Sequence, residues 1–150
     1  MNKDIQVIES KLKDIVERNE DSVMGFEKAA DNAKELGTRS YFENKVQERK
    51  KFITQLRNAT PALELGNTKI EGSKKGAVHR SWMDAKALFS ADNDETMLEE
   101  AIRGDKAAIE EYNEVMSDAL VPQRVKEILR EQKEVIQNDL ETSEILENLR

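Results

Sequence analysis

Residues 5–36 read IQVIESKLKDIVERNEDSVMGFEKAADNAKEL, and their spacing of apolar side chains is the clearest helical signal of the chain. Side chains expected to face the core, most of them apolar, recur in it at alternating spacings of three and four residues, the period of one face of an α-helix. Gly37 follows directly, at the position where a glycine commonly ends a helix. We therefore predict one long helix whose inward stripe consists of Ile5, Ile8, Leu12, Ile15, Asn19, Ser22, Phe26, Ala29, Ala33 and Leu36.

The second predicted helix begins a few residues later. Ser40 is followed three residues on by Glu43, the pattern of a capping box that opens a helix. Because the connection to the first helix is very short, the two helices should be antiparallel neighbours. The inward positions of this helix are Phe42, Val46, Arg49, Phe52, Ile53 and Leu56.

Residues 60–76 carry one proline and three glycines and have no sustained period. We expect a long connection here, and then a third helix that starts near Ala77, breaks at residues 90–94 and resumes with Asp94 as its N-cap. Pro122 is suited to the first turn of a fourth helix. The inward positions expected are Leu98, Ala101, Asp105, Ala108, Tyr112, Val115 and Ala119 in the third helix, and Val125, Leu129, Gln132, Ile136, Asp139 or Leu140, Ser143 and Leu146 in the fourth.

Two short turns and one long central connection predict an all-α fold, a single domain over residues 1–150. We favour a ferritin-like four-helix bundle with one long crossover between the second and third helices. The alternative is an up-down bundle with a long loop in the middle. Long connections are uncommon unless they span something, which favours the crossover.

Composition sets limits on function. The chain has 150 residues, a net charge of −7 and no cysteine, which argues against general nucleic-acid binding and excludes disulfides and thiolate chemistry. Neither a secretory signal nor a membrane span is visible, so we expect a cytoplasmic protein. Residues 39–86 hold 11 basic and 5 acidic side chains, against 13 and 26 elsewhere. This asymmetry is either ordinary surface variation or a basic patch for a partner or a second copy.

Polar side chains interrupt the inward stripes. Buried polar groups cost free energy unless they are satisfied, so we expect an internal hydrogen-bond layer in which Arg49 pairs with Asp105 or a neighbouring carboxylate. These polar inward positions are Asn19, Ser22, Arg49, Asp105, Gln132 and Ser143.

Motifs of enzymes are missing from the sequence. Di-metal bundles use Glu-x-x-His on two helices, but the only histidine is His79, and Gly76 stands three residues before it. Glu48 is followed three residues later by Lys51 instead of a histidine. There is also no Gly-rich phosphate loop and no Gly-x-Ser-x-Gly elbow. We therefore predict that the chain is not an enzyme.

Four segments nevertheless carry a family resemblance: GFEKAADNAK (25–34), HRSWMDAKALF (79–89), RGDKAAIEEYNEVM (103–116) and VPQRVKEILREQKEVI (121–136). They resemble uncharacterised bacterial ferritin-like four-helix-bundle proteins, grouped as a domain of unknown function with a His-Arg-x-Trp signature in the third helix. The resemblance covers nearly the whole chain. It implies a ferritin-like fold and stress-related expression, and no established activity.

The resemblance also suggests candidate metal ligands, namely Glu27, Glu48 and Asp105. A site built from them would be rich in carboxylates and would suit iron, manganese or zinc. This chain has Asp105 where relatives commonly have Glu, and it lacks a histidine in the last helix. The favoured function is therefore a non-enzymatic bundle that acts through protein contacts or self-association, and the alternative is metal binding at a degenerate di-metal site. His79 and Trp82 are expected to fasten the third helix.

Overall fold

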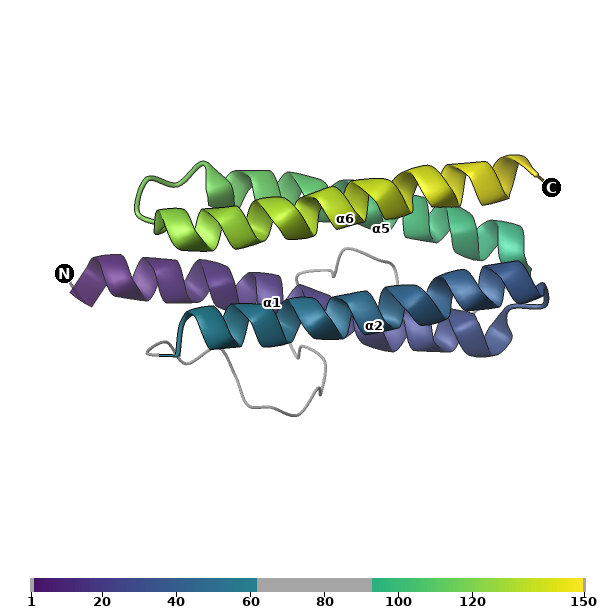
Figure 1. Cartoon of the computed structure of the whole chain (residues 1–150), viewed down its shortest axis with the longest axis horizontal. Helices are drawn as coiled ribbons and strands as arrows, with labels where there is room; N and C mark the ends of the chain where they lie inside the picture. Colours follow the sequence, from purple (N-terminus) through teal and green to yellow (C-terminus); the bar gives the residue numbers. More distant parts are fainter. Residues whose placement is uncertain (1, 62–92, 150) are drawn as a thin grey trace.

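The computed structural model describes residues 2–61 and 93–149, and within these ranges it contains four α-helices and no β-strand (Figure 1). The helices are α1 (Asn2–Asn32), α2 (Leu36–Ala59), α5 (Asp94–Met116) and α6 (Gln123–Asn148). The predicted all-helical, four-helix architecture is thus confirmed. The irregular stretch expected after Pro61, the first part of the third helix with His79 and Trp82, and most of the break at residues 90–94 lie outside the described residues.

The helices form two antiparallel hairpins, α1–α2 and α5–α6, which lie against each other (Figure 1). Contacts between the hairpins fix the directions. The end of α1 meets the start of α5, where the backbone N–H of Lys34 donates to Asp94 at 2.9 Å. Gln55 near the end of α2 accepts from Gln132 in the first half of α6 at 3.1 Å, and Tyr41 near the start of α2 contacts Ser143 near the end of α6. As a result, α1 is antiparallel to α5 and α2 to α6, whereas α2 and α5 run in the same direction (Figure 1).

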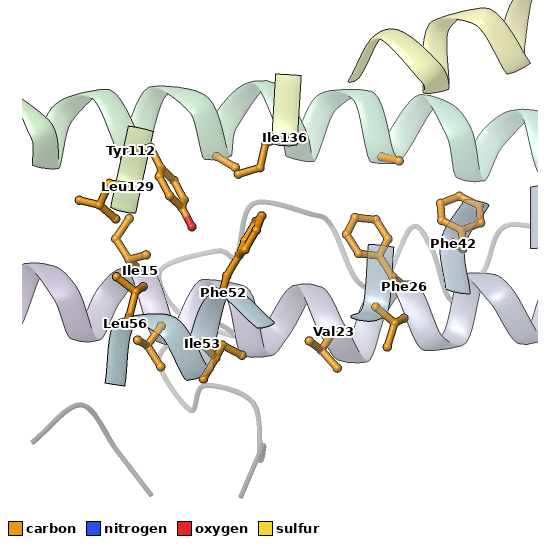
Figure 2. Close-up of a cluster of buried hydrophobic side chains, with 14 of the residues drawn as sticks. Ile15, Val23, Phe26, Phe42, Phe52, Ile53, Leu56, Tyr112, Leu129 and Ile136 are labelled. Atoms are coloured by element: carbon orange, nitrogen blue, oxygen red, sulfur yellow. The ribbon is translucent and has the colours of Figure 1, made fainter. Parts of the chain in front are cut away.

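The core is a continuous apolar cluster to which all four helices contribute (Figure 2). Phe26 of α1 stacks on Phe42 of α2, with ring centroids 5.9 Å apart. The predicted stripes account for most of it, since inward positions such as Leu12, Leu56 and Leu129 are buried. The exceptions lie at helix ends, where Ile5 and Leu36 are exposed.

The turn between α1 and α2 differs from the prediction. Helix α1 ends at Asn32 instead of continuing to Gly37, and α2 already begins at Leu36, so Gly37 lies in its first turn. The Ser40–Glu43 capping box is therefore wrong, because both residues are inside the helix. The physical reason is a distant partner. The carboxylate of Asp94 accepts the backbone N–H groups of Lys34 and Glu35, both at 2.9 Å, and so stabilises a tight turn here.

Two other helix starts shift by one residue. Asn93, not Asp94, is the N-cap of α5, and its side chain accepts the N–H of Thr96 at 2.8 Å. Asn93 can take this position because its backbone is extended, as an N-cap requires. Pro122 is the N-cap of α6, and its carbonyl accepts the first helical hydrogen bond, from Lys126 at 3.0 Å. Ala119 lies beyond the end of α5 and is exposed.

None of the helices in the described ranges is both long and apolar enough to span a membrane.

Candidate functional site

Four ionised side chains meet in the middle of the bundle, and we refer to them as the charge cluster: Lys45 and Arg49 of α2, Asp105 of α5 and Asp139 of α6. The Nζ of Lys45 lies 2.5 Å from Oδ2 of Asp105 and 3.5 Å from Oδ2 of Asp139. Arg49 reaches the other oxygen of Asp105 at 2.9 Å and Asp139 at 3.5 Å. Each cation therefore bridges both carboxylates, and the four charges cancel.

The helical repeat explains this arrangement. Lys45 and Arg49 are four residues apart, so they project from the same face of α2, one turn from each other. That face points at the two facing helices, each of which contributes one aspartate. Lys45 is completely buried and Arg49 and Asp105 almost so, with 0%, 1% and 2% of their surfaces exposed. Charges this deep are tolerable only because they are paired.

Aromatic rings close the charge cluster on the α1 and α2 sides. Lys45 Nζ lies 4.5 Å from the centroid of the Phe26 ring and 5.3 Å from that of Tyr41. The Arg49 guanidinium lies 5.3 Å from the centroid of the Phe52 ring. Ring faces carry negative charge density, so they stabilise the cations while they exclude water.

A hydroxyl pair extends the cluster along α6. The hydroxyl of Tyr41 donates to the backbone carbonyl of Asp139 at 2.7 Å and contacts the hydroxyl of Ser143. Burial is the main reason that the pKa of Tyr41 is raised far above its usual range, with the Asp105 carboxylate adding to it. Tyr41 is therefore a neutral donor here.

Burial and pairing act in opposite directions on the two cations. Burial lowers the pKa of Lys45, and the Asp105 carboxylate offsets this only in part. Burial also acts to lower the pKa of Arg49, but the Asp105 and Asp139 carboxylates outweigh it, and the pKa is raised. Arg49 is thus the more firmly charged of the two.

A third carboxyl group lies at the edge of the cluster. Glu48 is half-buried, and burial, together with a hydrogen bond to Asp139 and its charge, raises the pKa of Glu48 to about 8. One carboxyl oxygen of Glu48, Oε1, is buried and has no hydrogen-bond partner. The raised pKa favours the protonated form of Glu48.

A second polar layer crosses the bundle about two turns along from the cluster. Tyr112 of α5 accepts a hydrogen bond from Asn19 of α1 at 3.0 Å and donates to Gln132 of α6 at 2.7 Å. Gln132 in turn donates to the carbonyl of Phe52 and to Gln55, at 3.2 Å and 3.1 Å. We call this the amide layer; it joins all four helices. Figure 2 shows Tyr112 directed into the interior among the apolar side chains.

The structure does not bring the three predicted metal ligands together. Glu48 and Asp105 belong to the same buried region, but Asp105 is held by the two cations of α2. Glu27 lies on the surface, with its side chain 53% exposed and 3.8 Å from Lys50. Within the described ranges, the carboxylates close enough to share an ion are instead Glu95, Glu99 and Glu147, at the bundle end where α5 starts. Metal binding by the predicted set stays a prediction.

The predicted internal polar layer is confirmed. All six of its polar positions are buried, and Arg49 pairs with Asp105. Sequence reasoning missed Lys45 and Tyr41, which each lie beside a predicted core residue, Val46 and Phe42. The four-residue spacing of Lys45 and Arg49 was the available signal, because it places both cations on one face.

Chemically, the arrangement connects α2 to α5 and α6 through ion pairs. Its two cations lie between carboxylates, where they neutralise the negative charge. The described part of this region presents paired charges, a carboxyl group with a raised pKa and neutral hydroxyls.

Comparisons with known proteins give one positive result. Neither the curated proteins nor the solved structures contain a match to this chain. Residues 7–118, which include the turn between the first two helices and all of α5, match a family described as Domain of unknown function (DUF2383). The match covers well over half of the chain, so the protein belongs to this family.

Proposed function

We propose that this protein is a non-enzymatic helical bundle that acts through contacts of its outer surface, in the first place with a second copy of itself. The observation that carries the proposal is the charge cluster. The interior position at which a bundle of this kind would bind a ligand is filled by Lys45 and Arg49, each within 3.5 Å of two carboxylates. Binding is therefore assigned to the exterior.

One end of the bundle supports this assignment. Tyr41 of α2 contacts Ser143 of α6, so the residues that lie up to two turns beyond them are at the same end, where α2 begins and α6 finishes. Three large apolar side chains are exposed there: Leu36 at 78%, Ile145 at 60% and Leu149 at 78%. We call this the apolar end. Exposed apolar side chains at one end of a molecule are a common feature of protein-binding surfaces.

We further propose that the bundle has ferritin-like topology with one crossover. The support is geometric. Helices α2 and α5 run in the same direction, so the end of α2 and the start of α5 lie at opposite ends of the bundle (Figure 1). A chain that joins them has to travel the length of a helix, about 35 Å for 23 residues. Cytoplasmic location and stress-related expression remain expectations from the sequence and its resemblance.

The test is the mass of the protein in solution, measured by light scattering over a wide concentration range. We expect a concentration-dependent oligomer, and we expect Leu36→Gln combined with Leu149→Gln to shift it towards monomer. Leu120→Gln is the matched control, because Leu120 is 40% exposed but lies in the turn between α5 and α6, at the other end of the bundle. A monomer at high concentration would show that self-association is wrong. If the oligomer persists in the Leu36→Gln/Leu149→Gln double variant, the contact between copies does not lie at the apolar end.

A further inference from the structure

Helix α6 carries its basic and acidic side chains in a particular order. All of its basic side chains lie in the first half, residues 123–135, whereas residues 136–148 carry acidic ones only. A helix has a partial positive charge at its start and a partial negative charge at its end, so this order opposes the helix dipole. The first turn of α6 has no acidic side chain and its last turn no basic one. The charge order therefore does not stabilise α6 itself, in contrast to α5, whose first turn holds Asp94 and Glu95.

Six of these charges form one stripe on the surface of α6. They follow each other at steps of three, four or eight residues, which keeps them on one side of the helix. Three of them are exposed and three are half-buried. We call the cations of the stripe its basic half and the carboxylates its acidic half: Lys126, Arg130 and Lys133 in the first, and Glu141, Glu144 and Glu147 in the second.

The two halves of the stripe are arranged symmetrically about Gln137. Lys133 and Glu141 lie four residues to either side of it, and Arg130 and Glu144 lie seven residues to either side. If α6 is laid antiparallel against a copy of itself with Gln137 at the centre, each cation of the basic half faces a carboxylate of the copy's acidic half. A parallel arrangement would instead place carboxylates against carboxylates, which repel.

We propose that the second copy binds through its own α6, antiparallel to the first about a two-fold axis at Gln137, with the basic half of each copy against the acidic half of the other. This inference rests on the proposed self-association, and it names the surface and the orientation of the contact. Because a two-fold contact is self-complementary, each ion pair occurs twice. The charge order that opposes the dipole of α6 then stabilises the pair of helices.

The carboxylate at the end of the acidic half lies among other negative charges. Carboxylate oxygens of Glu147 and of Glu95 and Glu99 in α5 all lie within 4.8 Å of one another. Like charges at this distance repel, and a cation placed beside them reduces the repulsion. In the antiparallel arrangement, Lys126 of the second copy approaches these carboxylates. The contact therefore adds a positive charge where the single bundle concentrates negative ones.

The apolar end continues the same surface. Ile145 follows Glu141 by four residues and is 60% exposed, and Leu149 follows Ile145 by four residues and is 78% exposed. Side chains four residues apart are neighbours on a helix, so these apolar side chains border the acidic half of the stripe. Exposed ion pairs are individually weak. They determine the orientation in which the copies meet, and burial of the neighbouring apolar side chains supplies the affinity.

The experiment reverses charges in the full chain and measures its mass against concentration by light scattering. Arg130→Glu and Glu144→Arg each bring like charges together twice in a two-fold pair, so each variant alone should associate at least about tenfold more weakly than wild type. In an equimolar mixture, a pair with one copy of each variant has one native and one reversed ion pair, and association should return to near the wild-type level. The two positions are about 21 Å apart along the helix, so contacts within one chain cannot produce this recovery.

Lys106→Glu and Glu110→Arg are the matched controls, because they reverse exposed charges of the same two signs on α5. Both should leave the association unchanged. If neither reversal in α6 weakens an oligomeric wild type, or if the mixture does not recover, the antiparallel contact is wrong while the proposed self-association stands. A wild type that is monomeric at high concentration overturns both.

Discussion

Oδ2 of Asp94, in the first turn of α5, accepts the backbone N–H of Glu35, the N-cap of α2, at 2.9 Å. The other oxygen of the same carboxylate accepts the neighbouring N–H of Lys34. One side chain therefore satisfies two donors of a turn that lies about 60 residues away along the chain. The turn itself brings no side-chain cap to α2. Asp94, from the other hairpin, thus supplies the hydrogen-bond acceptor that the local sequence of the turn lacks.

Replacement of Asp94 by Ala should lower the free energy of unfolding by about 1.5–3 kcal/mol, because two backbone donors lose a charged acceptor. Asp94→Asn, which keeps one acceptor oxygen, should lie between Ala and wild type. Chemical denaturation measures the change, and amide exchange at Lys34 and Glu35 should accelerate selectively. Glu95→Gln, at the exposed next position, is the control; an equal loss there would contradict the role given to Asp94.

Asp105→Asn removes one of the two anions in the charge cluster and leaves Lys45 and Arg49 facing Asp139 alone. An uncompensated buried charge is strongly destabilising, so we expect the free energy of unfolding to fall by about 3–5 kcal/mol. Adding Lys45→Met to this variant restores the charge balance, and the double variant should be much more stable than the sum of the single losses implies. Simple additivity in this double-mutant cycle would show that the two charges are not coupled.

Tyr112→Phe deletes the hydroxyl at the centre of the amide layer, which bonds both Asn19 and Gln132. Both partners are buried, so we expect a loss of about 1–3 kcal/mol with little change in helix content. Urea denaturation followed by circular dichroism gives both quantities. The adjacent exposed position offers a control, because Asn113→Ala should change stability by no more than about 0.5 kcal/mol.

Gly37→Ala distinguishes the observed turn from the one predicted by sequence. Gly37 lies in the first turn of α2, and a methyl group added there would meet nothing within 4 Å. Alanine is the better helix former, so the variant should be more stable by about 0.5–1 kcal/mol. A glycine that ended α1 in a left-handed conformation would give the opposite result, a clear loss of melting temperature.

Addition of manganese, zinc or ferrous iron should leave the melting temperature of the wild type unchanged, because the two cations of α2 already neutralise Asp105. Elemental analysis of the purified protein should likewise find no stoichiometric metal. A rise in melting temperature that Glu27→Ala or Asp105→Ala abolishes would instead support the carboxylate-rich site suggested by the family resemblance.

The apolar stripes predicted the core well, because burial of one helix face leaves a direct mark on residue spacing. Even the Arg49–Asp105 pair could be predicted, since both residues interrupt an apolar stripe. The burial of Lys45 could not be predicted, because a lysine beside an apolar stripe usually lies in water. Its burial depends on aspartates that lie 60 and 94 residues further along the chain. The position of the α1–α2 turn depends equally on the distant Asp94.

The position of the charge cluster between the two hairpins also has a consequence for the order of folding. Contacts within each hairpin are close in sequence and form early, whereas docking must first strip water from four charges. The charge cluster should then assemble after the main kinetic barrier. Substitutions at Lys45 or Asp105 should therefore accelerate unfolding and barely slow folding, whereas loss of the Phe26–Phe42 stack should slow folding itself. Stopped-flow measurements on these variants would place the desolvation of the cluster in time, as the last event of assembly and the first of disassembly.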